Sequence, residues 1–352
     1  MTHAAVVVLF GGRSSEHSIS SVTAGGVLRA IDRDRYRVIP VGITRDGVFV
    51  LEDDDPDKFA LDRDALPEVV DNGTRVLWPH AGERTLRVRR ADGTEDELGE
   101  VDVVLPILHG THGEDGTVQG FLDTLGLPYA GGAVLDSALC MDKHFMKVVL
   151  RDAGIAVAPW ITVRRPEWTG DAAEIAQRAS ALPLPWFVKP ARAGSSVGVS
   201  KVHDVGELAA ALDLAFAEDD KVLVEQGVVG REIEVGVLGA RHGGGPRVSL
   251  PGEIVLTTRE FYDFEGKYLG GDGVEVVCPA ELTDDEVAAV QDAAVRAFTA
   301  VDGRGLARAD FFLGPDGPVV NELNTMPGFT PISMFPKCWI ASGLSYDALI
   351  TD

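Results

Sequence analysis

The sequence is short of cysteine and has no long apolar run. Its three cysteines, Cys140, Cys278 and Cys338, are too few for a disulfide framework and lack the spacing of a zinc site. We expect them to be small buried side chains in a reducing compartment. No apolar run is long enough to span a bilayer. The apolar residues 1–12 have no basic segment before them and end at two glycines, which predicts a strand and not a signal peptide. We therefore expect a cytoplasmic protein without a membrane partner.

Positive charge is also scarce. The chain has 32 Lys and Arg against 55 Asp and Glu, a formal net charge of −23. Such an acidic surface opposes binding to nucleic acid or to anionic lipid, because both need cations against phosphates. A nucleotide substrate stays open, since it needs only a local basic pocket. With 352 residues, 45% hydrophobic and 25% charged, the chain is expected to fold into two or three domains.

The first part of the chain has the pattern of an α/β protein. Residues 5–10 form a continuous apolar run typical of a buried parallel strand. A helix-like stretch follows up to residue 30, and residues 36–43 and 101–108 predict further strands. An open parallel sheet places its ligands at the carboxyl ends of its strands. Residues 52–100 are polar and are interpreted as an insertion of low functional content.

The rest of the chain predicts two α+β units. Residues 142–152 predict a helix with an apolar stripe of Phe145, Val148 and Val149. The remaining predicted elements are strands at 186–190, 197–202 and 221–226, helices at 205–217 and 284–299, and a hairpin at 306–324. A long irregular segment, residues 257–274, is suspected of function because such loops are uncommon in compact domains. We expect domains at 1–138, 139–226 and 227–352.

The hairpin carries a candidate metal site. Side chains alternate along a strand, so Arg308 and Asp310 share one face of the first strand, and Glu322 and Asn324 share one face of the second. Pairing about residue 316 places Asp310 opposite Glu322 and Arg308 opposite Asn324. Facing carboxylates repel unless a cation lies between them, and oxygen ligands of this kind suit Mg²⁺. The alternative is a salt-bridged hairpin in which Arg308 lies between the acids. The pattern alone leaves both open.

Several residues form a candidate phosphate site. Lys189 precedes the glycine- and serine-rich loop 192–196, whose backbone N–H groups can face phosphate oxygens, although the loop is no Walker A motif. Lys143 lies in the first turn of the predicted helix, where an anion is favoured. Glu225 and Glu232 flank a connector that can bind adenine through backbone groups and ribose through a carboxylate. Taken singly, these features are equally typical of a flexible turn, a solvated lysine and an exposed linker.

The order of these features resembles the ATP-grasp superfamily. Six motifs are similar to the D-alanine–D-alanine ligase family and span the chain from Val6 onward, apart from 52–100: residues 109–120, 137–143, 188–202, 262–268, 305–312 and 321–333. The resemblance implies an N-terminal open parallel α/β domain followed by a two-part ATP-grasp fold. Family members usually continue the last helix beyond the Ser345–Ala348 region, so we expect this terminus to be cut short.

The resemblance implies a nucleotide site and a metal site. Lys143 and Lys189 would contact the ATP phosphates, and the loop with Ser195 and Ser196 would close over them. Glu225 and Glu232 would bind the adenine and ribose side. Two Mg²⁺ ions, with Mn²⁺ as a substitute, would bind the hairpin residues, and Glu322 would bridge them: Asp310, Glu322 and Asn324.

The resemblance also implies substrate sites. The first D-alanine would place its ammonium near Glu16, with His109 close by, and the carboxylate of the second would reach Ser333 and Lys267. Arg308 and the backbone N–H of Gly328 would form the oxyanion site. A hydrogen-bonded set would tie the loop over the site: Tyr268, Ser195 and Glu16.

The implied activity is ATP-dependent ligation of two D-alanines through D-alanyl phosphate, for peptidoglycan precursors, by a homodimeric enzyme. The nearest rival activity is that of a D-alanine–D-lactate ligase, and Tyr268 in its intact motif favours the dipeptide enzyme. The sequence is also compatible with a phosphotransferase that forms no amide and with a non-catalytic nucleotide-binding regulator. Release of ADP together with a dipeptide would distinguish a ligase from a phosphotransferase.

Overall fold

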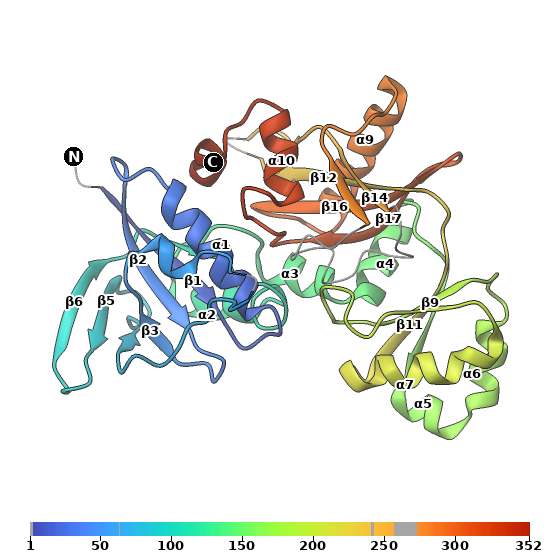
Figure 1. Ribbon diagram of the computed structural model, residues 1–352, viewed down its shortest axis with the longest axis horizontal. Helices are drawn as coiled ribbons and strands as arrows, with labels where there is room; N and C mark the ends of the chain where they lie inside the picture. Colours follow the sequence, from blue (N-terminus) through green and yellow to red (C-terminus); the bar gives the residue numbers. More distant parts are fainter. Residues whose placement is uncertain (1–2, 63, 241–242, 257–272) are drawn as a thin grey trace.

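The computed structural model describes residues 3–62, 64–240, 243–256 and 273–352. Within these residues the strands form four sheets. The N-terminal sheet lies at one end of the molecule and the central sheet at the other, with the C-terminal sheet between them (Figure 1). Across the part of the chain so described, no helix combines the length and the apolarity needed to cross a membrane.

The N-terminal sheet confirms the predicted parallel α/β pattern. Its strand order is β3-β2-β1-β7, and β1 pairs in parallel with both β2 and β7. Residues 5–11 of β1 are all buried, which explains why this strand is a continuous apolar run. The bounds are β1 Ala4–Gly11, β2 Tyr36–Ile43, β3 Phe49–Leu51, β7 Val103–Pro106, α1 His17–Ala30 and α2 Thr117–Leu125.

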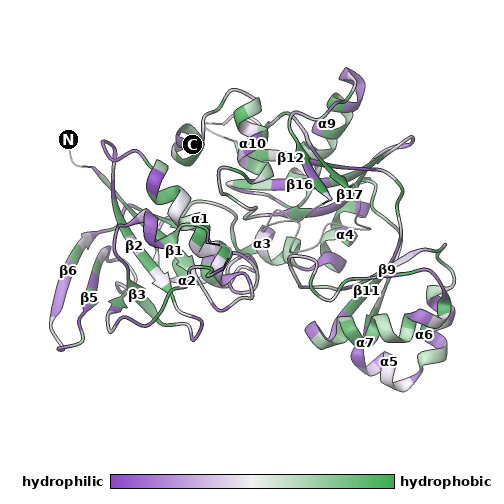
Figure 2. Ribbon diagram, in the orientation of Figure 1, coloured by the Kyte–Doolittle hydropathy of each residue, from purple (hydrophilic) through white to green (hydrophobic). Residues whose placement is uncertain are grey.

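Residues 52–100 are part of the N-terminal unit, and their interpretation as an insertion of low functional content is wrong. They contain η1 (Pro56–Phe59) and a small sheet of β4 (Arg75–Leu77), β5 (Thr85–Arg89) and β6 (Glu95–Glu100). Figure 2 shows β5 and β6 as largely hydrophilic, in keeping with their exposed outer side chains. Phe59 is buried and packs edge-on against Phe10, with the two ring centroids 4.8 Å apart. Leu61 lines a cavity at the candidate site. The polar composition of residues 52–100 gave no indication that Phe59 and Leu61 pack inward.

The central sheet has the order β10-β9-β11-β8. The predicted strands at 186–190 and 221–226 are confirmed. The other predicted strand here is shorter than expected, because its first residues belong to the glycine-rich loop, and the predicted helix at 205–217 begins as a 3-10 turn. The bounds are β8 Trp160–Arg164, β9 Trp186–Pro190, β10 Ser200–Val202, β11 Lys221–Gln226, α5 Arg165–Gly170, α6 Ala172–Ala179, η2 Val205–Glu207 and α7 Leu208–Glu218.

The C-terminal sheet has the order β15-β14-β12-β16-β17, with β13 paired to β12. Nearly all of the irregular segment predicted at 257–274 lies outside the described residues. Helix α4 begins after its N-cap Asp142 as predicted, and it buries Met146, Lys147 and Leu150. The predicted stripe is wrong for Phe145, which is exposed, whereas Val149 packs against the C-terminal core. The bounds are α3 Val134–Met141, α4 Lys143–Asp152, β12 Arg231–Leu238, β13 Arg247–Val248, β14 Gly252–Leu256, β15 Val274–Val277, α9 Asp284–Ala300, β16 Leu306–Gly314, β17 Gly317–Asn324, α10 Met334–Ala341 and α11 Tyr346–Thr351.

Candidate active site

Two adjoining cavities of about 600 and 480 Å³ lie where the three units meet. Ser195 and Glu234 line both cavities. Every candidate site residue within the described part of the chain lines one or both of them, whereas Lys267 and Tyr268 lie outside the described residues. The larger cavity is called the substrate cavity, after the ligand that the sequence resemblance implies, and is lined by Glu16, His109, Ser195, Arg308, Asn324, Gly328 and Ser333. The smaller one is called the nucleotide cavity for the same reason and is lined by Lys143, Lys189, Ser195, Ser196, Glu225, Glu232, Asp310 and Glu322.

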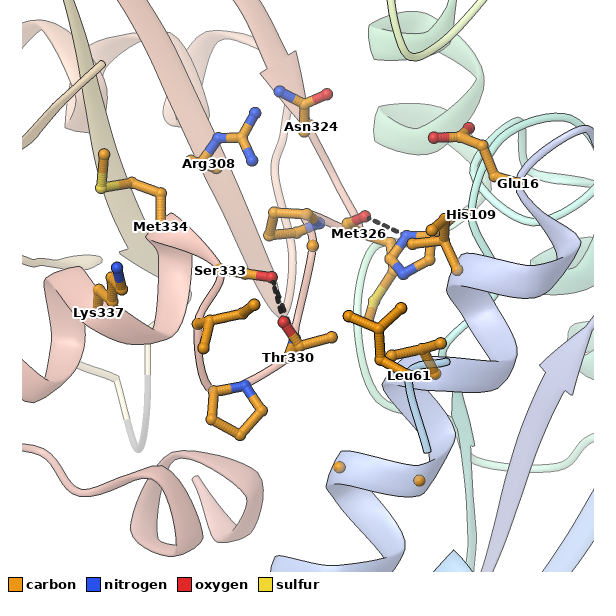
Figure 3. A pocket seen from close by; sticks show the side chains of 18 of the residues that line it. Glu16, Leu61, His109, Arg308, Asn324, Met326, Thr330, Ser333, Met334 and Lys337 are labelled. Carbon is orange, nitrogen blue, oxygen red and sulfur yellow. Dashed lines mark hydrogen bonds between the residues drawn. The ribbon is translucent and has the colours of Figure 1, made fainter. Parts of the chain in front are cut away.

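Glu16 lies at the start of α1, in the substrate cavity (Figure 3). It is buried, and its carboxylate accepts a hydrogen bond from the hydroxyl of Ser195. A Cβ atom at Gly110 or at Gly194 would come within 2.7 Å of its Oε2. Gly110 has a φ of 73°, which favours glycine, and at both positions glycine lets the backbone lie close to the carboxylate without displacing it. Glu16 follows β1 and Gly110 follows β7, which agrees with the expectation that ligands meet the carboxyl ends of parallel strands.

The glycine-rich loop between β9 and β10 has an unusual backbone. Ser195 and Ser196 have φ angles of 51° and 58°, in the left-handed region that non-glycine residues seldom adopt. Backbone held in this way costs about 1–3 kcal/mol per residue and is found mainly at functional sites. The ammonium of Lys143 donates to the carbonyl oxygen of Ala193 at 3.0 Å, so α4 holds the base of the loop.

His109 is buried beside Glu16. Its Nδ1 is 3.1 Å from the carbonyl oxygen of Met326 (dashed in Figure 3), and its Nε2 is 3.2 Å from the hydroxyl of Thr23. Burial lowers the pKa of His109, and the nearby Glu16 opposes this only in part. The ring is therefore neutral near pH 7. Because the carbonyl can only accept, Nδ1 carries the proton, and Nε2 without a proton faces the Thr23 oxygen, whose hydroxyl donates to the carbonyl oxygen of Ile19 at 2.9 Å.

The hairpin of β16 and β17 has the predicted register. Asp310 is the partner of Glu322 and Arg308 the partner of Asn324, and a bulge between Asp310 and Phe311 shifts the pairing toward the turn. The Nε and Nη2 atoms of Arg308 each donate a hydrogen bond to the Asp310 carboxylate at 2.7 Å. The Nε atom is also 2.9 Å from Glu234 Oε2. Burial alone would lower the pKa of Arg308, but Asp310 and Glu234 outweigh it and raise the pKa. The guanidinium is thus a fixed positive charge between the two cavities.

The hairpin residues fit a divalent cation by their chemistry. Asp310, Glu322 and Asn324 offer the hard oxygen atoms that Mg²⁺ prefers. Each of the two acids already has a cationic neighbour in the protein. Arg308 contacts Asp310, and the Lys143 ammonium lies 3.3 Å from Glu322. In the ranges that the structure covers, no cluster of three or more His, Cys, Asp or Glu side chains could hold a metal. Any metal here would therefore depend on the Asn324 amide and on the substrate as further ligands.

Lys189 and Glu225 form a buried ion pair in the nucleotide cavity. The Lys189 ammonium is 2.5 Å from Glu225 Oε2, and the Lys147 ammonium is 3.0 Å from Glu225 Oε1. Burial would raise the pKa of Glu225, but Lys189 and Lys147 outweigh it, so the pKa is lowered. With its carboxylate shared by two lysines, Glu225 can offer adenine its backbone, whereas its side chain holds Lys189. Sequence reasoning missed Lys147, because a lysine on the buried face of a helix has no signal of its own.

Glu114 is a further residue that the sequence analysis missed. It lies in the motif 109–120, lines the substrate cavity, and accepts a hydrogen bond from the backbone N–H of Gly110 at 2.7 Å. Burial and the nearby Glu16 raise the pKa of Glu114 to about 8. Three carboxylates, those of Glu16, Glu114 and Glu234, therefore line the substrate cavity, and that of Glu114 binds a proton at neutral pH. A bound ammonium would favour release of that proton.

Replacement of Glu114 should change how stability depends on pH. The pKa of Glu114 is raised on folding, so its contribution is complete below about pH 4.5, its unfolded value, and is lost as the pH rises through about 8. Glu114→Gln should match the wild type at pH 4 and become relatively more stable toward pH 9, as measured by the melting temperature across pH. Asp115→Asn is the control, because the pKa of Asp115 is lowered and its loss should destabilise the protein above about pH 4. A constant difference between Glu114→Gln and the wild type would contradict the assignment.

Comparison with known proteins supports one family. The model "D-ala D-ala ligase N-terminus" matches residues 5–132 and the model "D-ala D-ala ligase C-terminus" matches residues 149–352. The first match includes residues 52–100, for which the six sequence motifs have no counterpart. D-alanine–D-alanine ligases from Paenarthrobacter aurescens and Kineococcus radiotolerans are 50% and 51% identical to the chain, over 99% and 98% of it and 93% and 94% of their own lengths.

Solved structures give the same result. The VanG D-Ala:D-Ser ligase from Enterococcus faecalis has a TM-score of 0.82 at 33% identity, covering 99% of this chain and 98% of its own. The D-alanine–D-alanine ligase from Coxiella burnetii has a TM-score of 0.82 at 34% identity, covering 100% and 92%. The fold is thus the ATP-grasp fold of a ligase. The chain belongs to the D-alanine–D-alanine ligase family.

Proposed function

We propose that the protein uses ATP to join two D-alanines into D-alanyl-D-alanine, a peptidoglycan precursor. The observation that carries this proposal is the pair of adjoining cavities that share Ser195 and Glu234. One cavity has the lysines that suit phosphates, and the other has the buried Glu16 that suits an ammonium. The name and the roughly 50% identity of the relatives support D-alanine as the substrate.

The nucleotide cavity would hold ATP. Lys143 and Lys189 would contact its phosphates, under the loop that contains Ser195 and Ser196. The backbone at Glu225 would meet the adenine and Glu232 the ribose. Two Mg²⁺ ions, or Mn²⁺ in their place, would bind Asp310, Glu322 and Asn324 and neutralise charge on the transferred phosphoryl group.

The substrate cavity would hold the two D-alanines. Glu16 would accept the ammonium of the first, whose carboxylate oxygen takes the γ-phosphoryl group as ADP leaves. Ser333 would bind the carboxylate of the second, together with Lys267. The amine of the second D-alanine, once neutral, attacks the acyl carbon, and phosphate leaves. Arg308, held by Asp310 and Glu234, would stabilise the negative oxygen of the tetrahedral intermediate with the N–H of Gly328.

Closing the loop would protect the intermediate. An acyl phosphate reacts readily with water, so a ligase gains from excluding water during both steps. The hydrogen bond from Ser195 to Glu16 joins the loop to the first substrate's site. The proposed enzyme works in the cytoplasm, where ATP is supplied. The family resemblance supports a homodimer, which light scattering would measure.

A coupled assay tests the proposed function. The protein should release ADP with ATP, Mg²⁺ and D-alanine, and mass spectrometry should find one D-alanyl-D-alanine for each ADP. A mixture of D-alanine and D-lactate should yield mainly the dipeptide. Predominant D-alanyl-D-lactate would support a depsipeptide ligase, and ADP with a stable phosphorylated product would support a phosphotransferase. No ADP release from folded protein would contradict catalysis of this kind.

A further inference from the structure

Two cysteine thiols that do not line the candidate active site lie close together next to it. Cys278 follows β15, Cys338 lies in α10, and their sulfur atoms are 3.9 Å apart, within hydrogen-bonding distance for sulfur. Cys338 is fully buried and Cys278 is half-buried, and neither is in a disulfide. The third cysteine, Cys140, is buried in a separate apolar cluster. The chain therefore has one close pair of thiols and one isolated thiol.

The fold brings the pair together through a glycine. Glu253 of β14 pairs with Val277 of β15 in an antiparallel ladder, so Cys278, the residue after β15, comes to the position opposite Gly252. A Cβ atom at Gly252 would lie 2.2 Å from Met334 Sδ and 3.2 Å from Cys338 Sγ. With glycine at this position, both sulfur atoms of α10 lie close against the sheet without displacement. The contact between the thiols is thus built into the packing of α10 on β14.

The two thiols differ in chemistry. The hydrogen bond with Cys338 is the main cause that lowers the pKa of Cys278, and the positive charge of Lys337 adds to it. The same hydrogen bond and burial raise the pKa of Cys338. Cys278 is therefore the better thiolate and the more exposed sulfur, whereas Cys338 keeps its proton. A reactive thiolate beside a second thiol is the arrangement found at sites of reversible oxidation.

We propose that Cys278 and Cys338 form a site of reversible oxidation, at which a peroxide converts the pair to an intramolecular disulfide. The Cys278 thiolate attacks one peroxide oxygen, the O–O bond breaks, and the leaving hydroxide takes a proton to become water. This gives the sulfenic acid of Cys278. The sulfur of Cys338 then attacks that sulfur, its proton leaves with the hydroxyl group as a second water, and the S–S bond forms. A dithiol reductant reverses the reaction.

The disulfide would act on the ligase through α10. To reach a bond length of about 2.05 Å the sulfurs must approach by roughly 1.9 Å. The proposal is that side-chain rotation is accompanied by a shift of α10 against the sheet. Ser333 is the N-cap of α10, and Met334 and Lys337 of this helix line the substrate cavity. Misplacing a binding group by about 1 Å can cost about 100-fold in rate. We therefore expect the KM for the second D-alanine to rise by about 10- to 100-fold on oxidation.

The test uses the full chain with hydrogen peroxide. The intact mass should fall by two hydrogens, the thiols available to a blocking reagent after denaturation should fall from three to one, and a cross-linked peptide should contain Cys278 and Cys338. Dithiothreitol should reverse these changes and restore the KM. Cys140→Ser is the matched control and should still form the disulfide, whereas Cys278→Ser and Cys338→Ser should not.

Three results would overturn the proposal, and the first needs only the wild-type protein. The first is an intact mass of the peroxide-treated wild-type protein that does not fall by two hydrogens. Another is a two-hydrogen loss that persists in Cys338→Ser. The third is a disulfide that forms while the KM for the second D-alanine stays unchanged, which would disprove the coupling through α10. Because thiol counting does not depend on turnover, failure of the proposed ligase activity would be seen separately.

Discussion

The Glu322→Gln variant should fold like the wild type and lose about 10²–10³-fold in kcat. Glutamine is nearly isosteric with glutamate, and the change reduces repulsion between residue 322 and its strand partner Asp310. The variant keeps an oxygen but loses the negative charge that a divalent cation and the Lys143 ammonium both use, and Lys143 lies 3.3 Å away. The measurements are ADP release as a function of Mg²⁺ concentration and the melting temperature.

Asp316→Asn is the control for Glu322→Gln. Asp316 lies in the exposed turn of the same hairpin, so the control removes an equal charge outside both cavities. It should leave kcat and the Mg²⁺ dependence within about twofold, since isolated surface charges contribute little. If folded Glu322→Gln turned over at a rate close to the wild type, the proposed metal site would be wrong.

The Glu225→Gln variant should lose about 3–5 kcal/mol of the free energy of unfolding, because it leaves two buried ammonium groups without their carboxylate. Lys147 is fully buried, and Lys189 is 8% exposed. The pKa of Glu225 is lowered on folding, so its contribution is present above about pH 4.5 and is lost as the pH falls through the lowered value. The difference between variant and wild type, measured by urea titration, should therefore shrink in acid.

Lys147→Met is the comparison for Glu225→Gln. This change removes a cation but leaves Glu225 paired with Lys189 at 2.5 Å, and the methionine can fill the apolar space. We expect a cost of about 1–2 kcal/mol, within the usual range for point mutants. Equal costs for the two variants would show that Glu225 does not serve both lysines.

The sequence predicted the elements whose signals are local. The apolar run of β1 and the register of the hairpin follow from side-chain periodicity, and the N-cap Asp142 marks the start of α4. The predicted pairing of Asp310 with Glu322 is correct although the turn pairs Gly314 with Gly317, because the bulge after Asp310 adds one residue to β17. Symmetry about residue 316 therefore holds for the pairs between residues 308–310 and 322–324, which the bulge separates from the turn.

The sequence could not predict contacts that depend on tertiary packing. Phe145 was expected in the core of α4, but the helix turns Lys147 inward, because Glu225 of a distant strand provides a buried counter-charge. The raised pKa of Glu114 depends first on its burial and then on Glu16, about 100 residues away in the chain, and no local pattern reveals either. Leu61 lines the substrate cavity from a segment whose composition is that of a surface loop. In the first two cases the partner residue lies about 80 to 100 residues away along the chain.

The hydrogen bond between Ser195 and Glu16 has a thermodynamic consequence. Ser195 belongs to the loop that would close over nucleotide phosphates, and Glu16 to the site that would hold the first substrate's ammonium. A ligand that favours the closed loop also fixes the Glu16 carboxylate, and a ligand on Glu16 changes how well the loop is held. Linkage then requires that each ligand alter the other's binding constant by the same factor, whichever binds first. The test is to titrate a non-hydrolysable ATP analogue with and without D-alanine, and D-alanine with and without the analogue. The two ratios of binding constants should be equal.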